Sequence, residues 1–470
     1  MDETLAFAFG VALHLLVFRS GEWNLYTPHL LIGSVMVNGA AIFALARLTP
    51  GTSLLASSRA VSAAFAAVLA GIYISILVYR ALFHRLNRFP GPLPARISNA
   101  YVTTLKMKKM HLYDDVRQLH KKYGDVKMMA DNHVSMSPSA LRDYESRVQE
   151  YTRQLLDRLA ESCGQPIDMA MWFNFYSFDV MGDLAFGKRL NMLRDGVVHY
   201  YMEAVHGSQV FIAAYSHLIW LTPLLKAIPV LNNCRRLQRT ASRPDVFSWI
   251  LADFEAQGHE TPQDRLDLRG DAHLIVVAGS LACLFFELAR TPQVQEQLHA
   301  EISQHHAQMS GKPGEAVSDA VLSQLRYLGA CINETLRLYP PVPSGVQRMT
   351  PPEGLRLPNT LVSSLFWKDE RCFEQPDEFI PERWTSKPGL VLDASVYAPF
   401  GFGRYACAGK QLALMEIRLL VSQIMHRYTV SLAPDQTENA FLDGLKDTFT
   451  LTPPSLQLVF EPRGGPGRAA

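Results

Sequence analysis

The sequence predicts a mainly α-helical fold with minor β structure, in which one large domain follows apolar helices near the N-terminus. Three observations predict this: long uncharged apolar runs in the first 80 residues, apolar residues at helical spacing after them, and few, short strand-like runs. The 470 residues are 48% hydrophobic, which is enough to fill a large core. The net charge of +1 gives no general attraction for nucleic acid, so we expect no such partner.

Three apolar runs occupy residues 5–18, 29–46 and 60–79. The third has no charge over a length that matches a hydrocarbon core of about 30 Å at a rise of 1.5 Å per residue. A buried core helix is the alternative for any single run. Basic residues follow the third run, and by the positive-inside tendency the chain beyond them faces the cytosol. We therefore expect residues 1–88 to be a multi-pass membrane anchor with two or three spans, followed by one domain at residues 89–470.

A stiff proline-rich linker at residues 88–94 separates the two parts. Ser137 and Pro138 then provide a helix start, and Gly164 a stop. Further helices are expected at residues 172–187, which are apolar on almost all sides, at 274–288 and at 324–338. Short strands are expected at residues 361–366 and 456–460.

The segment with the clearest chemistry is residues 400–409, FGFGRYACAG, directly before a helical stretch. A dinucleotide-binding loop would need G-x-G-x-x-G, but Gly401 and Gly403 are followed by Gly409, which is too late. A haem site explains these residues better. Gly403 and Gly409 would let the backbone turn tightly around a sulfur with unusual dihedral angles, and the helix N-terminus after Cys407 would favour a thiolate.

The six cysteines are far apart and include no C-x-x-C pair. This spacing argues against a zinc site or a disulfide framework and fits a reducing compartment. We expect the five cysteines other than Cys407 to be small buried apolar residues.

Residues 400–409 resemble the cysteine loop of the cytochromes P-450, F-x-x-G-x-R-x-C-x-G. Phe400, Gly403, Cys407 and Gly409 occupy its fixed places, while Tyr405 stands where the family usually has arginine. The resemblance implies that Cys407 is the axial ligand of a haem b iron. It also implies a set of cofactor-contacting residues, some of which hold propionates: Phe400, Gly403, Arg404, Tyr405, Gly409 and Arg348.

Two more family signatures lie upstream of this loop in the expected order. Glu334 and Arg337 form E-x-x-R, whose spacing places both charges on one helix face. Residues 381–384 match P-E-R-W, which contains Arg383. A surface ion pair of little energetic value is the alternative. The resemblance implies instead that Glu334, Arg337 and Arg383 form a buried structural triad.

The chain also departs from the family. In the central helix, residues 278–280 begin the oxygen-binding motif, but Leu281 and Ala282 replace its acid–alcohol pair. The helices expected after residue 125, with a W-x-x-x-R that binds propionates, are absent, since residue 137 already begins the next matching segment. A wrongly joined gene model and a divergent or inactive protein both explain such losses, and the intact flanks favour the first.

The resemblance to fungal members implies a monooxygenase of secondary metabolism that hydroxylates or epoxidises a small lipophilic molecule. Its electrons would come from NADPH through a reductase, at the cytosolic face of the endoplasmic reticulum. Ser280 is a candidate for proton delivery, and Phe449 with residues 278–280 would line the substrate pocket. The alternatives are a haem-thiolate isomerase or dehydratase that needs no dioxygen, and a truncated, non-catalytic member.

Overall fold

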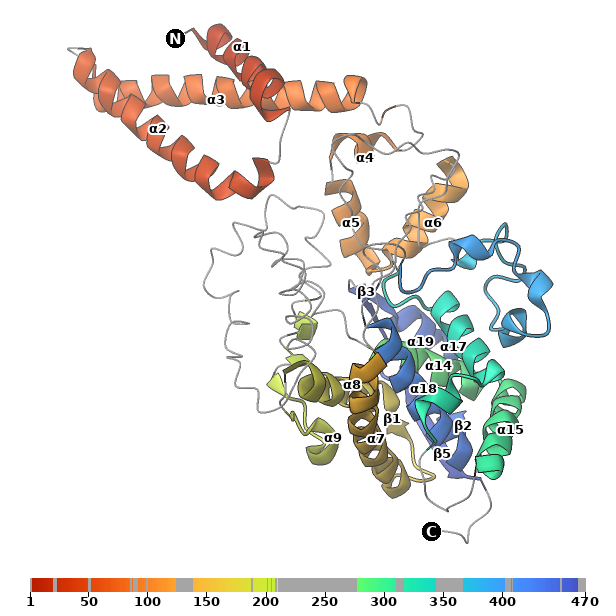
Figure 1. Ribbon diagram of the computed structural model, residues 1–470. Helices are drawn as coiled ribbons and strands as arrows, with labels where there is room; N and C mark the ends of the chain where they lie inside the picture. The colour runs from red at the N-terminus through yellow and green to blue at the C-terminus, as the bar shows by residue number, and fades with distance from the viewer. Residues whose placement is uncertain are drawn as a thin grey trace. The chain divides into compact units, whose positions relative to one another are not determined.

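The computed structural model describes residues 2–19, 23–49, 52–84, 92–98, 100–123, 138–186, 189–200, 277–309, 317–343, 367–401, 409–448 and 450–463, with a few single positions that include Cys407. These residues form two compact units. The first holds the described residues within Met1–Leu112 and Gln118–Gly124, and the second those within Tyr113–Arg117, Asp125–Val210 and Gln238–Ala470. Helices predominate in both, and the strands are short, as the sequence predicts (Figure 1).

The three N-terminal apolar runs are helices: α1 (Glu3–Leu13), α2 (Thr27–Leu48) and α3 (Leu54–Val78). A π-helical turn extends α1 to Phe18 and another extends α3 to Phe83. By length and composition, Thr27–Leu48 and the 30 residues Leu54–Phe83 are long and apolar enough to cross a membrane, whereas the first helix is shorter. The remaining helices that begin in this unit are α4 (Leu93–Ile97), α5 (Ala100–Lys109) and α6 (Leu112–Tyr123).

Helices α1 and α3 contact each other through their backbones. A Cβ atom on Gly10 would lie 2.1 Å from the carbonyl oxygen of Val68, and one on Gly71 would lie 2.2 Å from that of Phe7. Only glycine permits so close an approach. Further along both helices, Nδ1 of His14 is 2.8 Å from the hydroxyl oxygen of Ser75, so a polar contact adds to the packing.

In the second unit, α7 (Pro138–Glu161) begins at the predicted proline, and Gly164 follows its end with φ of 73°. Its apolar side chains at helical spacing are buried, from Tyr144 to Leu159. Helix α8 (Met169–Phe186) begins three residues before the prediction, where the Asp168 carboxylate accepts a hydrogen bond from the N–H of Met171 (3.3 Å).

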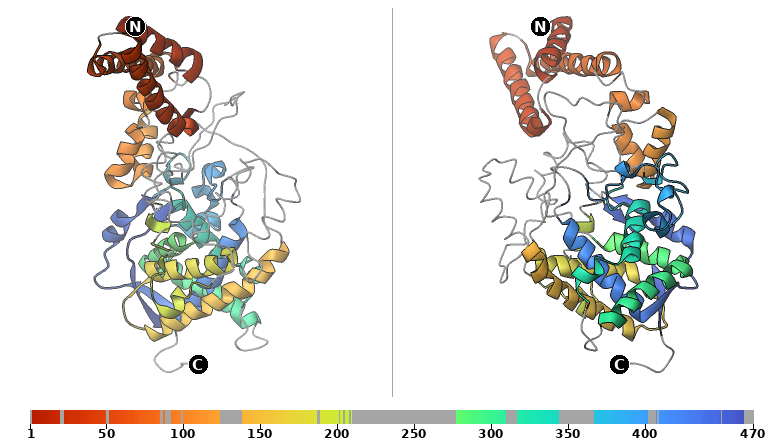
Figure 2. Two further views of the ribbon diagram at one scale, coloured as in Figure 1. Left: turned by 90° about the vertical axis from the view of Figure 1, so that its left-hand side faces the viewer. Right: turned by 45° about the vertical axis from the view of Figure 1, so that its right-hand side comes forward.

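The central helix α14 (Ala278–Arg290) is buried on all sides except at its C-terminal end. Residues 274–276 of the predicted helix lie outside the described residues. Helices α8 and α17 (Arg326–Leu338) pack against it, and Figure 2 shows α14 inside the second unit from two further sides. The aromatic rings of Phe173 and Phe285 hold α8 against α14 at a centroid distance of 5.1 Å.

The other α-helices among the described residues of the second unit are α9 (Met192–Asp195), α15 (Pro292–Met309), α16 (Asp319–Leu322), α18 (Lys410–Arg427) and α19 (Glu438–Gly444). Helix α18 follows the predicted cysteine loop and packs against α7, α15 and α16. The loop therefore ends on a helix that is fixed on several sides.

The strands within the described residues form two small antiparallel sheets. One has the order β1 (Ile167–Asp168), β5 (Gln457–Pro462), β2 (Tyr428–Leu432), and the other pairs β3 (Lys446–Thr448) with β4 (Thr450–Thr452). The strand predicted at residues 456–460 corresponds to β5, whereas the one predicted at residues 361–366 lies outside the described residues.

Candidate functional site

Cys407 lies three residues before the start of α18. Its N–H donates a hydrogen bond to the carbonyl oxygen of Phe400 (2.8 Å), and its own carbonyl oxygen accepts one from the N–H of Lys410 (3.3 Å). The residue is half-buried and forms no disulfide. The partial positive charge of a helix N-terminus stabilises a thiolate over a thiol. The backbone thus holds this sulfur where the sequence predicts a thiolate ligand.

The glycines around this sulfur differ in part from the prediction. Gly409, at the N-cap of α18, has φ of −80° and ψ of 3°, so the unusual dihedral angles expected there are wrong. Among the described residues of this loop, Gly401 is left-handed, with φ of 72°. Phe400 is half-buried against the core, and its ring centroid lies 5.8 Å from the Lys410 Nζ.

Four predicted cofactor contacts, Gly403, Arg404, Tyr405 and Arg348, lie outside the described residues, as does Phe449. Their roles stay predictions. The donor chemistry of the described part of the chain nevertheless suits a haem. It contains no cluster of three or more histidine, cysteine or acidic side chains that could hold a bare metal ion. A single thiolate at a helix N-terminus is the donor set for an iron whose remaining ligands come from a porphyrin.

The start of α14 lies against strand β4. A Cβ atom on Gly279 would lie 2.6 Å from the carbonyl oxygen of Leu451, so glycine is required here. Ser280, beside it, is buried. Leu281 and Ala282 are fully buried and apolar, and the next carboxylate along α14 is Glu287, seven residues or about 10 Å from Ser280. Ser280 is therefore a buried hydroxyl without an acidic neighbour in its own helical turn.

The predicted triad is present and fully buried. Arg337 binds both carboxylate oxygens of Glu334, at 2.9 Å each, and Nε of Arg383 donates to Oε1 of the same carboxylate at 2.8 Å. None of the three side chains is exposed. The alternative of a surface ion pair is thereby excluded.

The second positive charge of this triad is balanced by main-chain oxygens. Arg337 donates to the carbonyl oxygens of Trp367 (2.5 Å), Pro376 (2.7 Å) and Glu378 (3.1 Å). Arg383 donates in the same way to residues 374, 375 and 390. Burial lowers the pKa of Arg383, but every side-chain nitrogen of this guanidinium has an acceptor. The triad thus ties an irregular segment to α17 and has no titrating group free to react.

Sequence reasoning missed two features near these residues. Trp384 donates its indole N–H to Oε2 of Glu334 at 2.9 Å; its place directly after Arg383 was the only signal. Glu416 of α18 is buried, and burial raises its pKa to about 8. Within the part of the chain that the structure describes, Oε1 of Glu416 has no hydrogen-bond partner. No sequence pattern separates this residue from an exposed helical glutamate.

The family model for cytochrome P-450 matches residues 127–247 and 277–460 of this chain. The chain is 42% identical to cytochrome P-450 monooxygenase FCK2 of Fusarium pseudograminearum, over 98% of each chain. It is 32% identical to cytochrome P-450 monooxygenase phqL of Penicillium fellutanum, over 98% of this chain and 95% of that protein. It is 30% identical to tryprostatin B 6-hydroxylase of Aspergillus fumigatus, over 94% of this chain and 93% of that protein.

These alignments are longer than the chain. The alignment with the Fusarium protein spans 543 positions, whereas this chain has 470 residues, so at least 73 positions have no residue here. Because 98% of both chains is covered, the missing positions are internal. Internal losses of this size agree with the segments that the sequence indicates are absent.

Proposed function

Because this chain belongs to the cytochrome P-450 family, we propose that it is a haem-thiolate monooxygenase that hydroxylates a small lipophilic molecule in fungal secondary metabolism. The observation that carries this proposal is Cys407, whose backbone is held between Phe400 and the first residue of α18. When bound there, a haem would supply dioxygen activation, since thiolate ligation favours O–O cleavage. The relatives' names favour a monooxygenase over a haem-thiolate isomerase or dehydratase, and one of them is named as a hydroxylase.

Each of the following residues would have a separate role in haem binding. Cys407 would hold the iron, and Phe400 would support the loop from the core side. The predicted propionate contacts are Arg348, Arg404 and Tyr405. In place of the usual arginine, Tyr405 would offer a neutral hydrogen bond, which is weaker than a charge-assisted one. Electrons would come from NADPH through a reductase, as membership of the family implies.

The described part of α14 lacks the acidic side chain that would deliver protons next to Ser280. Ser280 is a buried hydroxyl at the start of α14, but Leu281 and Ala282 provide no acid beside it. Ser280 can pass on a proton only if a water molecule or another group donates to it. We therefore propose that the 470-residue form turns over with poor coupling, and that the missing internal segments are needed for full activity.

We place the enzyme at the endoplasmic reticulum membrane, with residues 1–88 as the anchor and residues 89–470 as the catalytic domain in the cytosol. The two long apolar helices, α2 and α3 with its extension, support this placement by their length and composition. The compact N-terminal unit extends beyond residue 88 and includes α4 and α5, so the boundary between anchor and catalytic domain stays a proposal.

The carbon monoxide difference spectrum of the ferrous protein tests the haem assignment. Cys407→Ser should abolish the thiolate-type spectrum, whereas Cys163→Ser, at a half-buried thiol that donates to the carbonyl oxygen of Phe460, should preserve it. The measurement is made on this chain and on a version that carries the missing segments of the Fusarium relative. A thiolate-type spectrum in Cys407→Ser would show that another residue binds the iron.

A further inference from the structure

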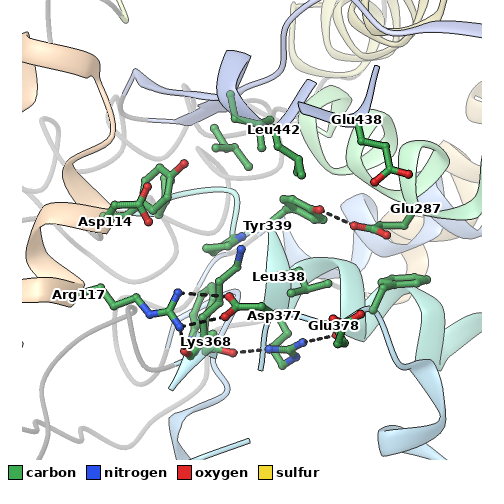
Figure 3. A pocket seen from close by; sticks show the side chains of 18 of the residues that line it. Asp114, Arg117, Glu287, Leu338, Tyr339, Lys368, Asp377, Glu378, Glu438 and Leu442 are labelled. Atoms are coloured by element: carbon green, nitrogen blue, oxygen red, sulfur yellow. Dashed lines mark hydrogen bonds and ion pairs between the residues drawn. The ribbon is translucent and has the colours of Figure 1, made fainter. Parts of the chain in front are cut away.

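The second unit contains a cavity of about 450 Å³ beside the C-terminal half of α14, and Ser280 is not among the residues that line it. Glu287 of α14, Tyr339 after α17 and Lys368 contribute to its wall, together with Leu442 of α19 (Figure 3). The volume falls within the range of roughly 300–1,000 Å³ that small-molecule sites occupy. Glu287 is seven positions after Ser280, about 10 Å along the helix, whereas Leu451 on another side of the cavity contacts Gly279.

Most charges around the cavity have partners. The Tyr339 hydroxyl donates to the Glu287 carboxylate, and Arg290 binds Glu287 (3.2 Å) and Glu438 (2.8 Å). At the outer edge, Arg117 binds Asp377 at 3.3 Å. Two further exposed carboxylates, Asp114 and Glu378, also lie at this edge, and Arg337 belongs to the triad.

Lys368 is the exception. Its Nζ lies 5.5 Å from the centroid of the Tyr339 ring. Among the residues that the structure describes, the ammonium has neither a hydrogen-bond acceptor nor a carboxylate within ion-pair distance. Burial lowers the pKa of Lys368, which reflects the cost of keeping this cation out of water. Lys368 is half-buried and lines the cavity, so a hydrogen-bond acceptor that enters the cavity would gain a charged donor there.

One part of the wall is formed by leucines. Leu445 and Leu451 are 4% and 8% exposed, and Leu338 and the half-buried Leu442 lie beside them. A ligand that fits both features has a carboxylate at one end and a compact apolar body at the other. The exposed acids at the edge are screened by solvent and by Arg117, and act less on a bound anion than Lys368 inside.

We propose that this cavity binds a small amphipathic carboxylic acid, with its carboxylate on the Lys368 ammonium and its apolar body against the leucine wall. A charge-assisted hydrogen bond inside a partly desolvated cavity is the strong kind, and it supplies the preference for an acid over a neutral molecule of the same shape. This proposal does not depend on haem binding at Cys407.

The test uses the full chain in lipid nanodiscs and two matched probes, para-trifluoromethylbenzoate and para-trifluoromethylbenzyl alcohol. Fluorine NMR measures their binding, with empty nanodiscs as the background. Mass spectrometry then measures acetylation of Lys368 by an amine-reactive ester with and without the benzoate, and the exposed Lys446 of β3 serves as the internal reference.

The benzoate should bind at least tenfold more tightly than the alcohol and should protect Lys368, but not Lys446, from acetylation. Lys368→Met should weaken benzoate binding by about tenfold or more, as expected for loss of a charged hydrogen bond, while Lys446→Met should leave it unchanged. Leu442→Trp should reduce binding of both probes by filling the cavity. Equal binding of acid and alcohol, unprotected Lys368, or unchanged binding in Lys368→Met would each overturn the proposal. If Lys368→Met does not fold, as judged by circular dichroism, the protection result in the unchanged chain decides.

Discussion

Replacing Arg337 with alanine removes a side chain of the triad that makes five hydrogen bonds. Arg337 donates two hydrogen bonds to Glu334 and three to the carbonyl oxygens of Trp367, Pro376 and Glu378. Each hydrogen bond to a charged group contributes roughly 1.5–3 kcal/mol, so a simple sum would exceed 7 kcal/mol.

The net loss is smaller than this sum, because Glu334 keeps other donors. Arg383 (2.8 Å), the Trp384 indole (2.9 Å) and the N–H of Ile380 (3.0 Å) still bind its carboxylate. Water can also enter the space that the arginine leaves and reach the stranded carbonyl oxygens. We therefore expect a cost of about 3–5 kcal/mol, the range for removing one partner of a buried ion pair. This is a large part of the 5–15 kcal/mol that typically stabilises a domain.

The assay is the thermal unfolding midpoint in detergent, together with the haem content of purified protein. Arg337→Ala should be strongly destabilised and haem-poor. Arg337→Lys should be nearly as damaged, because an ammonium cannot reproduce the five directed contacts of a guanidinium. The matched control is Arg371→Ala, since the side chain of Arg371 is 57% exposed beside Asp369; it should change the unfolding free energy by no more than about 0.5 kcal/mol. Normal haem content and midpoint in Arg337→Ala, with only a shifted pH–rate profile, would refute the structural role.

Three further predictions concern other parts of the chain. Protease added to intact microsomes should digest the chain beyond Arg88, and full protection would reverse the proposed orientation. Glu416→Gln should flatten the pH dependence of stability: burial raises the folded-state pKa to about 8, so the unfolding free energy of the unchanged chain falls as pH rises from about 4.5 to 8, by about 1.4 kcal/mol per unit. The measurement is the thermal unfolding midpoint of both proteins at pH 5 and pH 8. The same change in midpoint between the two pH values for the unchanged chain and for Glu416→Gln would contradict a buried, neutral Glu416. Restoring the missing segments should raise product formed per NADPH consumed, whereas efficient, coupled hydroxylation by the 470-residue form would mean that Ser280 or ordered water suffices for proton delivery.

Much of the fold could be predicted from local patterns. The start of α7 at Pro138, its glycine stop and the apolar stripe of α14 are local signals, and the structure confirms them. Helix α17 begins at Arg326, two residues after the prediction, because helix starts without a capping side chain are poorly marked in sequence. The triad residues could be found only by resemblance, because E-x-x-R by itself is compatible with an exposed ion pair.

The features of the fold and the site that could not be predicted depend on contacts between segments that are distant in the sequence. Strand β2 alternates apolar and polar residues over only five positions, directly after α18, and its pairing with β5 joins segments about 30 residues apart in the chain. Lys368 and Tyr339 are 29 positions apart in sequence and meet only because the triad holds the segment after Trp367 against α17. Glu416 looks like an ordinary helical acid until the surrounding helices cover it.

The contact between α1 and α3 has a consequence for membrane topology. Gly10 meets Val68, and further along His14 meets Ser75 and Arg19 meets Tyr79, so the two helices run in the same direction. Val68 lies near the middle of the apolar stretch of residues 60–79, and a bilayer crossed by that stretch would therefore contain Gly10 close to its midplane. A helix at that depth does not lie flat on the membrane surface. An odd number of membrane crossings would then separate the first turn of α1 from the catalytic domain. If that domain is cytosolic, the first turn of α1 lies on the lumenal side. An engineered glycan acceptor before Glu3 would then be modified.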